Sequence, residues 1–97
     1  MPTYVSLINW TDQGIKNFKD TSKRAKDFSD AVDKAGGHVR EILWTVGEYD
    51  IVAVIDLPDD ETLTASLLQV GAMGNIRTRT MRAFDAQQMA EVISRAG

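Results

Sequence analysis

One short run, YDIVAVIDL at residues 49–57, constrains the fold of this chain most strongly. It has the length and the β-branched content that are typical of a strand. Both faces predicted by strand alternation are apolar, with Ile51, Ala53 and Ile55 on one and Val52 and Val54 on the other. A strand of this kind is covered on both sides, which predicts a central place in a sheet.

Three further segments have the alternating pattern of strands. The first, in MPTYVSLINW, is apolar on both faces, with Tyr4, Ser6, Ile8 and Trp10 on one and Val5 and Leu7 on the other. The second, residues 38–46, places on one face His38, Arg40, Ile42 and Trp44. The run NIRTRTMRAF at residues 75–84 is the fourth predicted strand.

The remaining segments predict helices. Residues 11–37 carry apolar side chains at roughly helical spacing and end in a Gly-Gly pair, but the polar run at residues 20–22 interrupts the stripe. This region is therefore either one helix or a short helical turn followed by a longer helix. A second helix starts at Pro58 and Asp59, where acidic residues complement the helix dipole. The last helix starts at Asp85, which forms a predicted capping box with Gln88.

The resulting order, βαββαβ followed by a terminal helix, predicts an α+β fold of the ferredoxin-like type, built as one domain over residues 1–97. Right-handed crossovers place the first and third strands at the centre of an antiparallel four-stranded sheet, with the two main helices on one face. The open face would then expose apolar residues such as Tyr4, Ile8 or Trp44, depending on register. Because such a patch usually binds a partner, we expect a homodimer or higher homo-oligomer, with two sheets packed as a dimeric α/β barrel.

Composition narrows the classes of partner and compartment. The absence of cysteine excludes disulfides and fits a reducing cytoplasm. A net charge of -3 argues against binding to a nucleic-acid backbone. Because no apolar stretch is long enough to cross a bilayer and the N-terminus lacks a basic start, we expect a cytoplasmic protein with no membrane contact.

The tetrapeptide GEYD, between the second and third strands, carries a resemblance to a known family. With the LPDDE run and the GNIRTRTMRAF strand, the residues Gly47, Tyr49 and Asp50 resemble the GYD domain family, which is named for its Gly-Tyr-Asp signature. The resemblance covers nearly the whole chain. It implies a ferredoxin-like relative of the dimeric α/β barrels, and it brings no settled biochemical activity with it.

Two interpretations of GEYD stay open at this point. In the structural one, Gly47 supplies a positive φ, Asp50 bonds a backbone amide, and Tyr49 packs its ring. In the functional one, Tyr49 and Asp50 line the mouth of a barrel cavity as donor and acceptor for a small ligand. Strand alternation sends these two side chains to opposite faces, which counts against a coupled pair.

Other residues are candidates for chemistry. His38, the only histidine, is the natural general base near neutral pH, with Asp50 as the second catalytic candidate. Arg77 and Arg79 share one strand face and would clamp a carboxylate or phosphate, or simply keep an edge strand soluble. Trp44 would stack a planar ligand or fill a core or subunit contact. One histidine without cysteine predicts no metal site, and no residue pattern identifies a cofactor.

Three functional classes follow. The first is an oligomeric binding or regulatory protein that holds a small molecule in the barrel interior. The second is a cofactor-independent enzyme of the dimeric α/β barrel type, which performs proton transfer, isomerisation or oxygenation. The third is an assembly protein without chemistry. An enzyme needs His38 or Asp50 to face a closed apolar pocket, whereas a binding protein needs only the pocket.

Overall fold

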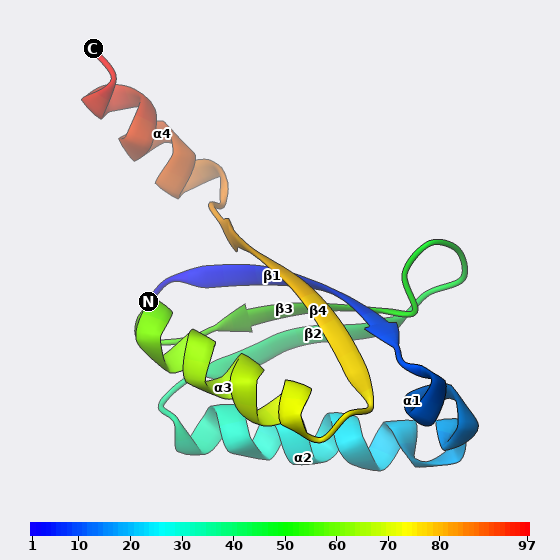
Figure 1. Ribbon diagram of the computed structural model, residues 1–97. Coiled ribbons are helices and arrows are strands. Elements are labelled where there is room, and N and C mark those ends of the chain that lie inside the picture. The colour runs from blue at the N-terminus through cyan, green and yellow to red at the C-terminus, as the bar shows by residue number, and fades with distance from the viewer.

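The computed structural model describes residues 1–97 and contains a four-stranded antiparallel sheet with the strand order β2-β3-β1-β4. The elements are β1 (Thr3–Trp10), α1 (Asp12–Lys16), η1 (Phe18–Asp20), α2 (Thr21–Lys34), β2 (His38–Trp44), β3 (Ile51–Asp56), α3 (Asp60–Ala72), β4 (Ile76–Ala83) and α4 (Ala86–Arg95). Both α2 and α3 cover one face of the sheet (Figure 1). The predicted ferredoxin-like α+β fold, with β1 and β3 at its centre, is confirmed. No helix is both long and apolar enough to span a bilayer.

The helical region after β1 is divided, which was one of the two predicted alternatives. Thr11 caps α1 by accepting a hydrogen bond from the Gly14 backbone N–H. The Thr11 hydroxyl also donates to the Gly74 carbonyl oxygen at 2.6 Å. Gly14 lies so close to the loop after α3 that a Cβ there would meet the Asn75 carbonyl oxygen at 1.9 Å. The division of the helix thus lets α1 pack directly on the loop that leads into β4.

The apolar side of β1 that faces the helices is not the one that we expected to be covered. Tyr4 and Ile8 are buried under α2 and α3, and Trp44 lies on the same side, where its indole Nε1 donates to Thr21 Oγ1 at 3.0 Å. The prediction that these three residues line the open face is therefore wrong. Both sides of β1 are apolar, so alternation alone could not say which side the helices cover.

The core lies between the sheet and the helices and contains the buried residues Tyr4, Ile8, Val32, Ile51, Ala53, Ile55, Leu57 and Leu63. The opposite face of the sheet has no cover from the chain's own helices (Figure 1). Its apolar residues follow from the strand register: Val5, Leu7, Leu43, Val52, Val54 and Met81. We call this set the open face.

The C-terminal helix α4 stands away from the rest of the molecule (Figure 1). Its predicted capping box forms, since the Gln88 backbone N–H donates to Asp85 and the Gln88 side chain accepts from the Asp85 backbone N–H. Its apolar residues Met89, Val92 and Ile93 are exposed. A helix with an apolar stripe usually buries that stripe, and here no element of the same chain does so.

Candidate functional site

The GEYD segment forms the turn between β2 and β3, and its aspartate is engaged by the backbone. The Asp50 carboxylate accepts from the Trp10 backbone N–H at 2.9 Å and from Asn9 Nδ2 at 3.4 Å. The Asp50 backbone N–H donates to the Ile8 carbonyl at 2.9 Å. Asp50 therefore joins the turn to the end of β1.

The other residues of the turn agree with a structural role. Gly47 has a φ of 138°, which confirms the predicted positive value and strains any residue with a Cβ. Tyr49 is half-buried, and its carbonyl accepts from Thr45 Oγ1 at 2.5 Å. These contacts form within the chain and need no ligand. The role of Tyr49 and Asp50 in ligand binding therefore stays a prediction.

The remaining predicted residues do not gather in one place within a chain. His38 is exposed at the start of β2, next to Asp56, whereas Asp50 lies at the other end of the sheet. An acid–base pair of these two would therefore need a second chain. Arg77 and Arg79 are exposed on β4, at the sheet edge opposite to β2 and Trp44. Their roles in ligand binding stay predictions.

A carboxylate at the end of β3 has strong partners. Asp56 accepts from Thr3 Oγ1 at 2.6 Å and from Arg40 Nε at 2.6 Å, and its side chain is only 13% exposed. Burial raises the pKa of this carboxyl, but the hydrogen bonds from Thr3 and Arg40 and the positive charge of Arg40 outweigh burial, so the pKa lies below its ordinary value. The contacts of Asp56 with Thr3 and Arg40 link β1, β2 and β3 on the side of the open face.

A second buried polar contact ties the sheet to α3. Tyr4 donates its hydroxyl proton to Asp60 at 2.5 Å. Burial, followed by the hydrogen bond to Asp60 and the charge of that carboxylate, raises the pKa of Tyr4 to about 12. The phenol therefore stays protonated at any physiological pH and acts as a donor.

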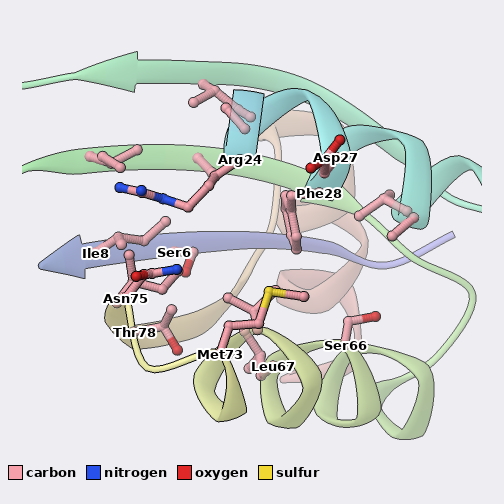
Figure 2. A pocket seen from close by; sticks show the side chains of 18 of the residues that line it. Ser6, Ile8, Arg24, Asp27, Phe28, Ser66, Leu67, Met73, Asn75 and Thr78 are labelled. Atoms are coloured by element: carbon pink, nitrogen blue, oxygen red, sulfur yellow. The ribbon is translucent and has the colours of Figure 1, made fainter. Parts of the chain in front are cut away.

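An apolar cavity lies between the sheet, α2 and α3, on the side away from the open face (Figure 2). Its volume is about 180 Å³. Phe28 points into it from α2, and Met73 points toward Phe28 from the end of α3 (Figure 2). Ala53 and Ile8 of the sheet form part of its floor, so most of the lining is apolar. The cavity is a partly open pocket with apolar walls and not a sealed void.

Polar groups gather at one end of this cavity. Arg24 of α2 and Asn75 of the loop before β4 lie at the same end (Figure 2). Trp10 also lines the cavity, and its indole Nε1 is buried without a hydrogen-bond partner. Ser6 also lines the cavity, and its hydroxyl shares a hydrogen bond with the Thr80 hydroxyl at 2.9 Å.

Sequence reasoning missed this cavity, although one signal was available. Ser6 interrupts the otherwise aromatic and aliphatic side of β1, between Tyr4 and Ile8. A small polar residue in the middle of a core-facing stripe leaves room above it, and Ala53 is its neighbour on β3. Arg24 gave no signal, because on sequence alone it is one more charge on an exposed helix.

Comparison with known proteins places the chain in a family. The family model described as GYD domain matches residues 4–93. The chain belongs to the GYD domain family. A relative from Thermus thermophilus, named glutamine synthetase and cystathionine beta-lyase binding protein, is 28% identical in an alignment 97 residues long that covers 98% of this chain and 98% of that protein. Among solved structures, TTHA0845, also from Thermus thermophilus, is similar with a TM-score of 0.54 and 28% identity, covering 89% of this chain and 96% of that one.

A second group of solved structures shares the fold of this GYD domain. The feast or famine regulatory protein from M. tuberculosis, solved in complex with L-methionine, has a TM-score of 0.67 at 16% identity. The match covers 89% of this chain and 52% of that protein, so this chain spans about half its length. At this identity the likeness shows the ferredoxin-like fold alone.

Proposed function

We propose that this GYD domain is a self-associating binding protein whose chains pair through their open faces and whose assembly holds a small molecule. The observation that carries the proposal is the composition of the open face. Its apolar side chains lie in two adjacent rows across the strands, one with Leu43, Val52 and Leu7 and the other with Val54, Val5 and Met81. Leu43 is 52% exposed and Met81 is 50% exposed. A continuous patch of this kind on a small domain favours a protein partner.

The borders of the open face support a second copy of the chain as that partner. Polar residues bound the apolar rows at both ends, with Asp56 and Thr3 at one end and Asn9 and Arg77 at the other. The turn at residues 45–50 and α4 rise at opposite ends of the sheet, on the side away from α2 and α3 (Figure 1). A second sheet on the open face would lie between these two walls and would give the apolar stripe of α4 a surface to cover.

Charge at the two sheet edges fits a two-fold arrangement. Glu41 lies on the open side of edge strand β2, and Arg79 lies on the open side of edge strand β4. A two-fold axis parallel to the strands brings β2 of one chain over β4 of the other. In that arrangement each Glu41 faces the Arg79 edge of its partner, and both edges gain charge complementarity.

Light scattering after size-exclusion chromatography tests self-association directly. At micromolar concentration we expect a mass of at least twice the 10.7 kDa of one chain. Leu43→Asp places a charge in one of the two apolar rows of the open face and should yield monomers. Leu68→Asp is the matched control, because Leu68 is a 70% exposed leucine on α3, on the other side of the molecule. A wild-type monomer, or equal dissociation by both variants, contradicts the proposal.

A second candidate function is the binding of a metabolic enzyme, as the name of the Thermus relative states for that protein. The exposed apolar stripe of α4 favours it, since helices of this kind dock into grooves on partner proteins. Biolayer interferometry with purified glutamine synthetase tests it, with Ile93→Asp as the variant that should lose binding. Glu91→Gln, on the same helix, is the control that should keep it. Binding that survives Ile93→Asp excludes α4 as the docking element.

A further inference from the structure

We infer that the cavity between α2, α3 and the sheet is a binding site for a small monocarboxylic acid with an apolar body. The inference rests on the small-molecule part of the proposed function and is independent of self-association. It places the ligand inside one chain, beneath the helices, and not between two sheets. Four observations lead to it: the size of the cavity, its apolar walls, the unpartnered indole N–H, and the cation at the same cavity.

The size and the walls define the body of the ligand. The cavity has a volume of about 180 Å³, and Phe28, Met73 and Ala53 are among its apolar lining residues. An apolar cavity of roughly 150 Å³ stays dry and takes up benzene, so this one fits a body of about six to eight carbon atoms. A ligand can reach it from solvent, because the cavity is partly open.

The polar groups define the head of the ligand as an acceptor. The buried Nε1–H of Trp10 has no acceptor in the chain, and a buried donor without a partner is costly. The Asn75 side-chain oxygen accepts from Gln13 Nε2 at 2.9 Å, which leaves the Asn75 amide nitrogen as a donor. A ligand that brings an oxygen to the end of the cavity where Arg24 and Asn75 lie would give the Asn75 amide an acceptor, and Trp10, whose indole N–H lacks one, belongs to the same lining.

Arg24 makes the acceptor a carboxylate. Its guanidinium donates to the backbone carbonyls of Asn17 at 2.9 Å and Gly14 at 3.4 Å and pairs with no carboxylate of the chain. A guanidinium with donors left over binds carboxylates strongly. Asp27, the acid of the cavity lining, sits at the rim with a 60% exposed side chain and is paired with Lys23 at 3.0 Å. A single arginine with neutral donors suits one carboxylate, whereas a phosphate group usually gathers several cations or a row of backbone N–H groups.

Titration with hexanoate, followed by proton–nitrogen NMR of the two indole N–H groups, tests the site. We expect the Trp10 signal to move with hexanoate in a saturable way. The Trp44 signal, whose N–H already donates to Thr21, should stay in place and serves as the internal reference. Hexanamide, the neutral isostere, should bind about tenfold more weakly, because it lacks the charge that Arg24 recognises.

Variants separate this site from simple adsorption. Arg24→Met should weaken hexanoate about tenfold and leave hexanamide nearly unchanged. Ala53→Leu fills the floor of the cavity and should abolish the binding of both probes. If Ala53→Leu does not fold, Ala31→Trp is the alternative, because Ala31 is an exposed residue of α2 that also lines the cavity. This variant too should abolish the binding of both probes.

Three outcomes would overturn the inference: a Trp10 signal that does not respond to hexanoate, an unchanged hexanoate preference in Arg24→Met, or full binding in the filled variants. The Leu43→Asp variant keeps the result distinct from self-association. If that variant is monomeric and hexanoate still moves its Trp10 signal, the ligand site lies within one chain. If it is monomeric and no longer binds, the ligand belongs to the interface and this inference fails.

Discussion

The aspartate of the GYD signature offers the sharpest test of the structure. Asp50→Ala removes the acceptor of the Trp10 backbone N–H, which the wild-type carboxylate holds at 2.9 Å, and the weaker contact with Asn9 Nδ2 at 3.4 Å. Because Trp10 is half-buried at the end of a central strand, its N–H is left with a partly unmade hydrogen bond. We expect the free energy of unfolding to fall by about 2 kcal/mol, within the range for a lost hydrogen bond to a charged group.

The size of the expected effect is large enough for a simple assay. In a domain of this length 1 kcal/mol changes the melting temperature by about 4 °C or more, so Asp50→Ala should melt about 8 °C below wild type. Asp50→Asn keeps an acceptor oxygen but loses the charge, and should cost about half as much. Glu48→Ala is the control, because its side chain is exposed and only its backbone carbonyl accepts from Asn9.

Circular dichroism melts of the four proteins, at one protein concentration and with the mass measured in parallel, decide between the two interpretations of the signature. If Asp50→Ala melts within about 2 °C of wild type while Glu48→Ala does the same, the bond to Trp10 does not hold the turn. Asp50 would then be free for a ligand, and the structural interpretation of the signature would be wrong. A loss of stability without any ligand present supports the structural role.

Three further predictions concern stability. The pKa of Asp56 is lowered in the folded chain, so the ionised carboxylate stabilises the fold above the ordinary carboxyl pKa, and this contribution is lost as the pH falls below about 4. Asp56→Asn should therefore lower the free energy of unfolding by about 1 to 2 kcal/mol in urea melts at pH 7 and by much less at pH 3. The pKa of Tyr4 is raised to about 12, so the contribution of its protonated hydroxyl to stability is fully present below pH 10 and is lost as the pH rises from 10 to 12. Wild type should therefore lose about 2 to 3 kcal/mol of its free energy of unfolding over this range through Tyr4, and Tyr4→Phe should not. An equal fall of stability with pH in both proteins would contradict this prediction. Gly14→Ala brings a Cβ to 1.9 Å from the Asn75 carbonyl oxygen and should cost about 1 to 3 kcal/mol, whereas Gly71→Ala, with open space at its Cβ, should be tolerated in the same thermal melts.

Local patterns were enough to predict the order of the elements and the caps of the last two helices, because each depends on neighbours along the chain. The alternation of residues 51–55 predicted a central strand, and β3 is one. The Asp59 side chain caps α3 by accepting from the Thr62 backbone N–H, and Asp85 caps α4 in the same way. The positive φ of Gly47 follows from the needs of a short turn.

Only the tertiary structure decided which apolar side of the sheet the helices cover. Tyr4 and Val5 belong to opposite apolar stripes of one strand, and the sequence offers no local reason to bury one of them first. Burial of the Tyr4 side lets its hydroxyl reach Asp60, which lies 56 positions further along the chain. That contact depends on where the crossover places α3, so no window of the sequence contains it.

The cavity is a long-range feature in the same sense. Arg24, Ala53 and Asn75 line one space although they come from a helix, a strand and a loop far apart in the chain. Each residue has an ordinary local explanation, as a helix surface charge, a small strand residue and a turn residue. Their meeting depends on the spacing between α2 and α3 over the sheet, which is set by packing of the whole core. The sequence by itself therefore determined the order of the elements and the caps of α3 and α4, while only the tertiary structure determined how the first helical region divides and which groups share a space.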